Sequence, residues 1–353
     1  MLVEKARLPL RELVLTGPLP SFLKIFIYRL RGYKIGRKVK IGFGSVVVGK
    51  DVEIGDGVSI GLFTIIRGRT IQIGRYATIR STSMIDTERI EILEDARINE
   101  QVFIGGLSTP DSYIHIGKRS LIMQMSFLNP AKPLVIGNDT VVGGHTLIFT
   151  HGSWHSVLDG YQATFEPITI GNNVYIAWRV FIMPGVTIGH DATIGANSLV
   201  NKSIPVGSLA VGSPAKILKT AAEYPQPKTP AEQNELTLTF LKEFLQYLSY
   251  HDLRIEVLQE KPMLHAVVKT GNSSEKGHNL YYTSHTGDPT ADLSERSVFI
   301  ALQQISEEAR AVIGAAGAMW LDLERRERSG SSDIGEEAVQ FLSRYGLRFN
   351  RVD

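Results

Sequence analysis

The stretch ITIGNNVYIAWRVFIMPGVTIGHDATIGANSLV, residues 168–200, carries an aliphatic residue at every sixth position. A helix repeats every 3.6 residues and a strand alternates every two, so neither produces this stride. A stride of six predicts a parallel β-helix, in which each hexad supplies one short strand and one corner, and three hexads complete a triangular coil. The inward-facing residues predicted in this run are Ile170, Ile176, Ile182, Ile188, Ile194, Val200 and Val206.

The same stride extends toward the N-terminus, where it begins at Ile35 and Ile41. Stacked coils of a β-helix place neighbouring strands about 4.8 Å apart. A corner of such a coil needs a residue that tolerates a positive φ, and Asn197 in IGANSL suits that place. The inward positions predicted for the earlier coils are Val48, Ile54, Ile60, Ile66, Ile73, Ile79, Ile85, Ile92, Ile98, Ile104, Ile116, Ile122, Ile136, Val142 and Ile148.

Extra residues interrupt the stride at three places, within segments 105–115, 123–135 and 149–169. Such insertions are predicted to be loops that leave a coil. Loops on a rigid scaffold carry a large share of binding and catalytic residues. The longest of the three, FTHGSWHSVLDGYQATFEPIT, contains His151 and His155, so we expect the functional site beside it.

The run from His151 to Lys219 resembles the hexapeptide-repeat acyltransferases of the maltose- and galactoside-type O-acetyltransferase group. The motifs that carry the resemblance are the histidine loop, the coil PITIGNNV, the segment PGVTIG, the corner IGANS and the closing turn GSPAK. The resemblance covers about residues 35–219. It implies a left-handed β-helix, which is an exception to the right-handed crossover rule. It also implies acetyl-CoA as the acyl donor, a carbohydrate acceptor, and a homotrimer with its sites between neighbouring prisms.

The composition divides the chain into four predicted parts. These are a basic amphipathic segment at 1–34, the β-helix at 35–220, a proline-marked linker at 221–235, and a small α/β domain of unknown role at 236–353. The last part is predicted to form helices at 236–250, over part of 294–316 and at 334–345, and strands at 254–259, 263–270, from 318, and 347–352. The predicted fold is therefore an all-β left-handed parallel β-helix with an N-terminal amphipathic helix and a small C-terminal α/β domain.

The N-terminal segment is rich in lysine and arginine, although the net charge of the whole chain is only +2. Within it, SFLKIFIYRLRG at 21–32 mixes apolar and basic residues, is too short and too charged to span a bilayer, and lacks the features of a signal peptide. Two interpretations stay open. The helix lies on the anionic inner face of a membrane, or it packs on the end of the main domain. The chain is expected to be cytoplasmic, and no nucleic-acid partner is predicted.

The chain has no cysteine, which excludes disulfides, thiolate metal sites and a covalent thioester on the enzyme. Direct attack of an acceptor hydroxyl on a bound acyl-CoA is the simplest remaining route. A hydroxyl needs a base to accept its proton during the attack, and histidine is well suited to this role near neutral pH. The tetrahedral oxyanion also needs a hydrogen-bond donor, which is commonly a backbone N–H.

The resemblance assigns the acceptor side of the site. Counted back from Pro167, His151 matches the catalytic histidine, and His155 matches a second loop histidine that contacts substrate in galactoside-type enzymes. Trp154 is predicted to stack on a sugar ring, and Asn129 to take the place of the acidic or amide residue one coil before the histidine. A solvated loop histidine at 155 and an aromatic residue that only caps a coil at 154 stay open as alternatives. His145 is expected to face outward.

The resemblance also assigns the donor side, in the groove between coils. The predicted CoA-contacting residues are Ala177, Trp178, Ala196, Asn201, Lys202, Lys216 and Lys219. The two last lysines, in SPAKILK, would meet the CoA phosphates as mobile point charges. Trp178 departs from the family, which has a small residue there, so it either stacks on the donor or crowds the channel.

Two other functions stay open at this stage. A zinc hydratase of the γ-carbonic-anhydrase type shares the β-helix and a GSPAK-like ending, but His145 follows Val142 by three residues where that family has two. Zinc could still bind, although no metal is expected, and metal analysis distinguishes this alternative. The third hypothesis is a non-catalytic trimeric scaffold that presents the acidic C-terminal domain. Trp178 favours it, and failure to bind any CoA thioester would support it.

Overall fold

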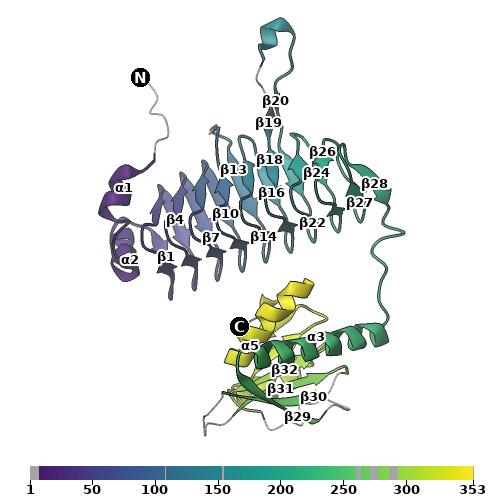
Figure 1. Cartoon of the computed structure of the whole chain (residues 1–353). Coiled ribbons are helices and arrows are strands. Elements are labelled where there is room, and N and C mark those ends of the chain that lie inside the picture. Colours follow the sequence, from purple (N-terminus) through teal and green to yellow (C-terminus); the bar gives the residue numbers. More distant parts are fainter. Residues whose placement is uncertain are drawn as a thin grey trace. The chain divides into compact units, whose positions relative to one another are not determined.

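The computed structural model describes residues 8–107, 109–152, 155–259, 264–270, 277–285 and 293–352. The chain divides into two compact units, Met1–Pro225 and Gln226–Asp353 (Figure 1). Trp154, the predicted sugar-stacking residue, lies outside the described residues, as do residues 1–7 of the predicted basic segment.

Three sheets of short parallel strands form the walls of the first unit. Sheet A contains β1 (Lys34–Ile35), β4 (Asp51–Ile54), β7 (Thr70–Ile73), β10 (Arg89–Ile92), β13 (Tyr113–Ile116), β16 (Leu134–Ile136), β21 (Ile168–Ile170) and β24 (Thr187–Ile188). Sheet B contains β2 (Lys40–Ile41), β5 (Ser59–Ile60), β8 (Thr78–Ile79), β11 (Arg97–Ile98), β14 (Leu121–Ile122), β17 (Val141–Val142), β22 (Tyr175–Ile176), β25 (Thr193–Ile194), β27 (Leu209–Val211) and the antiparallel β28 (Lys216–Lys219). Sheet C contains β3 (Val46–Val48), β6 (Ile65–Arg67), β9 (Met84–Asp86), β12 (Phe103–Ile104), β15 (Phe127–Asn129), β18 (Leu147–Phe149), β23 (Phe181–Ile182) and β26 (Leu199–Val200).

The chain visits the sheets in the order A, B, C and then returns to A, which confirms the predicted parallel β-helix (Figure 1). Inward aliphatic residues of successive coils stack in register, as Ile136, Ile170 and Ile188 do in sheet A, and form one continuous buried core. Burial of this apolar column is the main source of stability for such a fold.

Two predicted inward positions are wrong. Val47 rather than Val48 pairs with Ile66 and is fully buried, because the stride of six continues from Ile41 to Val47 and the extra residue comes after Val47. Near the end of the β-helix, Ile204 rather than Val206 bridges to Ile188, because the preceding corner is two residues shorter than a hexad allows. Val206 is consequently 54% exposed.

The corners hold non-glycine residues in the left-handed region of backbone space. Asn197 has a φ of 57°, as predicted, and His145 and Arg179 have φ of 56° and 61° on the same corner. Each of these residues donates its N–H to a carbonyl of the preceding coil, as Asn197 does to Trp178 at 3.0 Å and His145 does to Gln124 at 3.1 Å. These regular hydrogen bonds offset the conformational cost of the strained backbone.

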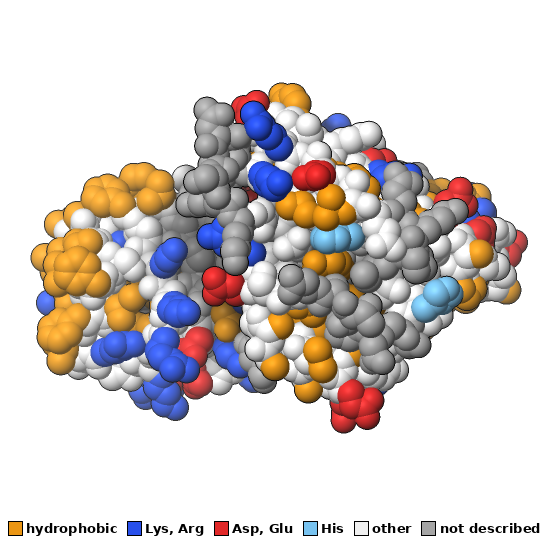
Figure 2. All heavy atoms as spheres, turned by 90° about the horizontal axis from the view of Figure 1, so that it is seen from below, with side chains coloured by type: hydrophobic (Ala, Val, Ile, Leu, Met, Phe, Trp, Pro, Cys, Tyr) orange, Lys and Arg blue, Asp and Glu red, His pale blue; other side chains and the backbone are white. Residues whose placement is uncertain are grey.

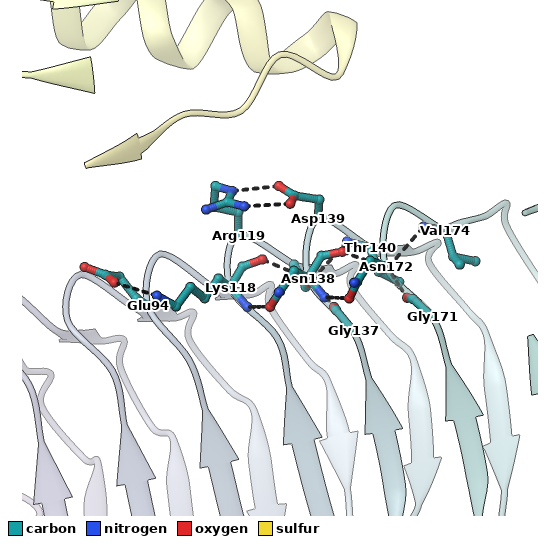
Figure 3. A network of polar contacts seen from close by, with 11 residues as sticks. Glu94, Lys118, Arg119, Gly137, Asn138, Asp139, Thr140, Gly171, Asn172 and Val174 are labelled. Carbon is teal, nitrogen blue, oxygen red and sulfur yellow. Dashed lines mark hydrogen bonds and ion pairs between the residues drawn. The ribbon is translucent and has the colours of Figure 1, made fainter. Parts of the chain in front are cut away.

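Side chains reinforce the corner between sheets A and B with a ladder of polar contacts (Figure 3). Asn138 Oδ1 accepts from Lys118 N at 2.8 Å, and Asn172 Oδ1 accepts from Asn138 N at 2.8 Å. The fully buried Thr140 donates its hydroxyl to Gly171 O at 2.8 Å and accepts from Val174 N at 3.1 Å. These contacts satisfy backbone groups that the turn leaves without strand partners.

We expect Thr140→Val to lower the free energy of unfolding by about 1–3 kcal/mol, because the isosteric valine leaves the Gly171 carbonyl and the Val174 amide buried without partners. Urea denaturation followed by circular dichroism measures the change. Thr187→Val, at an exposed strand position, is the matched control and should shift stability by less than about 0.5 kcal/mol. Equal losses in the two variants would contradict the proposed role of the Thr140 hydroxyl.

Two short helices, α1 (Leu10–Leu15) and α2 (Ser21–Leu30), precede the first coil at the N-terminal end of the prism (Figure 1). Tyr28 of α2 and the neighbouring Tyr33 join the apolar core of the β-helix, with their ring centroids 5.4 Å apart. Helix α2 therefore covers the end of the apolar core at the first coil, where no preceding coil stacks on it.

The second unit is a seven-stranded mixed sheet with helices on both faces. Its strands, in spatial order, are β29 (Leu253–Gln259), β30 (Leu264–Thr270), β31 (His278–Thr283), β32 (Ser297–Ala301), β33 (Met319–Asp322), β34 (Glu327–Ser329) and β35 (Asn350–Arg351). Helices α3 (Pro230–Tyr250) and α5 (Asp333–Leu342) cover one face, and α4 (Glu307–Ala315) covers the other. The helix predicted at 236–250 begins six residues earlier, because Thr229 and Glu232 form a capping box ahead of it.

Candidate active site

His151 lies at the base of an arm that leaves the β-helix after β18. Strand β19 (His151–Gly152) pairs antiparallel with β20 (Thr164–Phe165), and the described part of the loop between them includes a single turn of 3-10 helix, η1 (Val157–Asp159). Figure 1 shows this arm projecting away from the prism. The additional residues in segment 149–169 therefore build a separate two-stranded element rather than a loose loop.

The imidazole of His151 is held between aromatic rings. It stacks on Phe165 with ring centroids 5.6 Å apart and planes at 19°, and it lies 6.2 Å from Phe149. Its Nδ1 atom is buried and has no hydrogen-bond partner among the residues that the structure describes. A buried polar atom without a partner is uncommon in a folded protein and is a reason to consider a bound ligand.

Asn129 lies one coil before His151, at the end of β15. The Thr150 N–H and hydroxyl both donate to the Asn129 carbonyl oxygen, at 3.2 Å and 2.9 Å, which holds the two coils together immediately before His151. The Asn129 side chain is 6% exposed and lies in the space that a Cβ on Gly106 would need. Its Oδ1 is also buried, without a hydrogen-bond partner in the described ranges. This corner thus holds two unsatisfied side-chain acceptors or donors within one coil of each other.

His155 occupies a different environment from His151. It is exposed and stacks on Tyr161 of the same arm, with ring centroids 4.4 Å apart. This ring contact gives His155 a role in the conformation of the arm, and its contact with substrate stays a prediction.

Three residues near His151 have no counterpart in the sequence prediction. Phe165 supplies the stacking surface for the imidazole, and Thr150 ties the arm to Asn129. Glu166 donates its N–H to Thr150 O at 3.0 Å, and its carboxylate lies where a Cβ on Gly185 would stand. The pairing of β19 with β20 brings these residues together, and a two-residue strand leaves no periodic signal in the sequence.

Ala177, Trp178 and Ala196, from the predicted donor side, lie on the corner between sheets B and C. Trp178 is 39% exposed and packs over Gly144, where a Cβ would collide with the indole ring. The indole also lies 6.0 Å from the ring of His145. The side chain of Trp178 is therefore directed along the corner, toward the preceding coil. Ala196 is the exposed residue immediately before Asn197, which donates to the Trp178 carbonyl on that corner.

The other predicted donor residues fall into two groups. Asn201 and Lys202 are exposed and follow β26, on the corner between sheets C and A where His151 follows β18. Lys216 and Lys219 stand at the two ends of β28, paired with Val211 and Leu209 respectively. We call the corner between sheets B and C the Trp178 corner, and the corner between sheets C and A the His151 corner. Within one chain, these two corners lie at opposite ends of the strands of sheet C, about 10 Å apart for a three-residue strand.

The three histidines considered for a zinc site are not brought to one place. His145 packs against Trp178 on one corner, and His151 and His155 lie on the arm. Among the residues that the structure describes, no group of three or more His, Asp or Glu side chains is arranged to hold a metal ion.

Comparison with known proteins agrees with this geometry. The model of the family "Bacterial transferase hexapeptide (six repeats)" matches residues 167–202. Galactoside O-acetyltransferase of Escherichia coli is 36% identical over 110 residues, which are 31% of this chain and 54% of that protein. A Schizosaccharomyces pombe protein whose name marks it as a proposed acetyltransferase is 32% identical over 139 residues, which are 37% of this chain and 67% of that protein.

Among solved structures, the polysialic-acid-specific acetyltransferase NeuO is 18% identical with a TM-score of 0.34, over 60% of this chain and 96% of that one. A hexapeptide-repeat acetyltransferase of Vibrio cholerae, solved with acetyl coenzyme A, is 20% identical with a TM-score of 0.27, over 60% of this chain and 84% of that one.

The β-helix and these sequence relatives place the chain in one class: it belongs to the hexapeptide-repeat acetyltransferases, with their left-handed parallel β-helix. It spans about half the length of the Escherichia coli relative, with 54% of that protein covered.

Proposed function

We propose that the chain is an O-acetyltransferase that moves the acetyl group of acetyl-CoA to a sugar hydroxyl. The observation that carries the proposal is the corner where His151 Nδ1 and Asn129 Oδ1 are both buried and have no hydrogen-bond partner within the described part of the chain. Membership of an acetyltransferase family supports the reaction, and the galactoside acceptor in the name of the Escherichia coli relative supports a sugar.

The proposed reaction needs one proton acceptor and no metal. The acceptor hydroxyl attacks the thioester carbonyl while the imidazole of His151 takes its proton, so a C–O bond forms as a tetrahedral oxyanion. Collapse of that intermediate breaks the C–S bond, and the imidazolium returns the proton to the leaving thiolate of CoA. A backbone N–H near the corner would stabilise the oxyanion. The amide of Asn129 would hydrogen-bond the acceptor, and the stacking of Phe165 on His151 would fix the plane of the base.

Release of free CoA thiol from acetyl-CoA, measured in the presence of oligosaccharide acceptors, tests the proposal. The chain contains no cysteine, so a thiol reagent reports only the product. Acceptor-dependent thiol release that stays at the uncatalysed rate for every sugar would contradict the proposed activity.

We further propose that the active enzyme is a homotrimer with sites between subunits. Sheet C carries an outward row of aromatic side chains in which Phe103 and Phe127, Phe127 and Phe149, and Phe149 and Phe181 have ring centroids 4.9 Å, 5.1 Å and 5.7 Å apart. A continuous outward apolar row on one wall of a prism is suited to packing against another copy. Such packing would bring the Trp178 corner of one subunit to the His151 corner of its neighbour.

We expect Trp178→Ala to raise the KM for acetyl-CoA by roughly tenfold with little change in kcat, because loss of a stacking surface costs about 1–3 kcal/mol of binding. The indole rests on Gly144, so we expect it to form a wall of the donor groove rather than to block it. Steady-state kinetics measure the effect, and Tyr175→Ala, which removes another exposed ring on β22, is the control. A lower KM in Trp178→Ala would instead mean that the indole obstructs the donor.

We propose that the acetylated sugar belongs to a surface polysaccharide and that the enzyme works peripherally at the inner face of the membrane. The basic and apolar N-terminal helices support this location. Within the described residues, no helix is long and apolar enough to cross a bilayer.

A further inference from the structure

Helix α2 attaches to the β-helix through several polar side-chain groups, beside the apolar contacts of the Tyr28 ring and of Ile25 with the core. Lys24 and Tyr28 are fully buried. Lys24 Nζ donates to Gly42 O at 2.5 Å and Ser45 O at 2.9 Å, and the Tyr28 hydroxyl accepts from Val47 N at 3.0 Å. Burial lowers the pKa of the Lys24 ammonium, and the two carbonyl oxygens compensate for its lost hydration. These contacts satisfy backbone groups of the first coil, which has no earlier coil to pair with.

Further polar contacts fix α2 along its whole length. At its first residue, the Ser21 hydroxyl accepts from Ile41 N at 2.9 Å. Near its last turn, Arg29 Nη2 donates to Ile35 O at 2.8 Å and Gly36 O at 3.0 Å. The helix is therefore docked in one orientation, and the side that faces solvent is determined by these contacts.

The solvent-facing side of the two helices is apolar. Phe22 is 69% exposed and Phe26 is 60% exposed, one turn apart on α2. The other exposed apolar residues of the two helices are Leu10, Val14, Leu15, Leu23 and Leu30. Figure 2 shows apolar side chains gathered at the end where α1 and α2 lie, with lysine and arginine side chains next to them. This distribution is the reverse of an ordinary surface helix, and an exposed apolar patch with a polar border marks an interaction surface.

A groove of about 740 Å³ lies beside α2, against the chain that links β1 to β2. Its apolar walls are Phe22, Leu23, Ile25, Phe26 and Val39. Its basic rim is Arg29, Arg37 and Lys38. Glu12, which is the only acidic residue between positions 8 and 43, already pairs with Arg31 at 3.4 Å. On the rim itself, Arg37 Nη2 lies 3.5 Å from Asp56 Oδ2, so one of the three basic side chains is already paired. The groove thus combines room for a hydrocarbon chain with a rim whose other cations, Arg29 and Lys38, are not part of a described ion pair.

We propose that this groove binds the phosphate and the first part of an acyl chain of an anionic phospholipid, with α1 and α2 lying in the headgroup layer of a membrane. An apolar helix face bordered by lysine and arginine is the arrangement that binds anionic bilayers, since burial and charge attraction act together. The basic residues of the rim predict a preference for anionic over neutral bilayers. This site deepens the proposed location of the enzyme, but it does not depend on acetyl transfer.

Sedimentation of the full-length chain with vesicles tests the site. The vesicles contain either phosphatidylcholine alone or phosphatidylcholine with phosphatidylserine, and we expect clear binding only to the second. Phe22→Ser with Phe26→Ser should weaken this binding by at least roughly 100-fold through lost apolar burial. Arg37→Gln with Lys38→Asn should weaken it by roughly 30-fold through lost charge, and asparagine suits the positive φ of position 38.

Matched substitutions in the second unit serve as controls. Val312→Ser with Tyr250→Ser removes exposed apolar side chains, Lys242→Gln with Arg254→Gln removes exposed charges, and both should bind vesicles as the native chain does. Equal binding to neutral vesicles, or unchanged binding of either variant of the groove, would overturn the proposal. The proposal would also be overturned if the native chain formed an oligomer that the two phenylalanine substitutions dissociate. The apolar patch would then join copies of the chain rather than bind lipid. Binding is measured without acetyl-CoA or acceptor, so failure of the lipid site is separable from failure of the enzyme.

Discussion

Replacing His151 by alanine should lower the kcat of acetyl transfer by roughly 10²–10⁴-fold, with the KM for acetyl-CoA little changed. The expected size is that of a general base that accepts a proton in the transition state. The substitution leaves the donor groove intact, and Trp178 and Ala196 lie at the other end of the sheet C strands, so ground-state binding of the donor should persist. Initial rates of thiol release at several acetyl-CoA concentrations separate the two parameters.

His155→Ala is the matched control for this experiment, because the two histidines lie on the same arm. His155 is exposed and stacks on Tyr161, so its loss should change kcat by less than about tenfold. A second control is the binding of acetyl-CoA to His151→Ala by calorimetry, which shows that the donor still enters. Full turnover by His151→Ala would remove this histidine from the mechanism. Absence of both turnover and CoA binding in the native chain would favour the scaffold.

The β-helix could be predicted from the sequence because each inward residue is specified locally. A coil needs one aliphatic residue per hexad, and that residue stacks on its equivalents whatever the length of the insertions between coils, as Ile136 stacks on Ile170 across the arm. Val206 shows the limit of this rule. The stride alone could not reveal that the corner before Ile204 is shortened.

The position of His151 could be predicted from its distance to Pro167, but the surroundings of His151 could not. Its stacking partner Phe165 reaches it through the pairing of two-residue strands, which carries no periodic signal.

In the second unit, β31 and β32 were missed for another reason. Four consecutive residues of β31, from Leu280 to Thr283, and all of β32, from Ser297 to Ala301, are buried, so neither strand shows the alternation of a half-exposed strand.

Helix α2 shows that two sequence interpretations need not exclude each other. A packed helix and a membrane-facing helix were alternatives at the level of sequence, because both need a basic amphipathic segment. In the structure, the packed side carries the polar groups of Lys24 and Tyr28, and most of the large apolar side chains of the helix remain exposed. The sequence could not show which face of the helix packs on the β-helix. A hydrophobic pattern is interpreted on the assumption that apolar residues are the buried ones, and this helix departs from that assumption.

Two inactive variants should restore activity when they are combined in one trimer. His151→Ala removes the base, and Ala196→Trp fills the exposed donor corner without entering the core. If each site uses the His151 corner of one subunit and the Ala196 corner of the next, every mixed trimer contains one site with both corners native. Co-expression with two affinity tags and purification over both should then recover about a third of the native turnover, from two parents that each show almost none.

The control pair is His151→Ala with Asn129→Ala. These residues lie on the same corner, one coil apart and joined through Thr150, so no site in a mixed trimer of these two variants has that corner intact. Mixing them should leave the turnover no higher than the average of the two parents. If His151→Ala with Ala196→Trp behaved in the same way, the donor and the base would have to meet within a single chain. Bound acetyl-CoA would then have to lie along sheet C of one subunit, over the roughly 10 Å between the Ala196 corner and the His151 corner. The aromatic row on that sheet would then contact the donor rather than a neighbouring subunit.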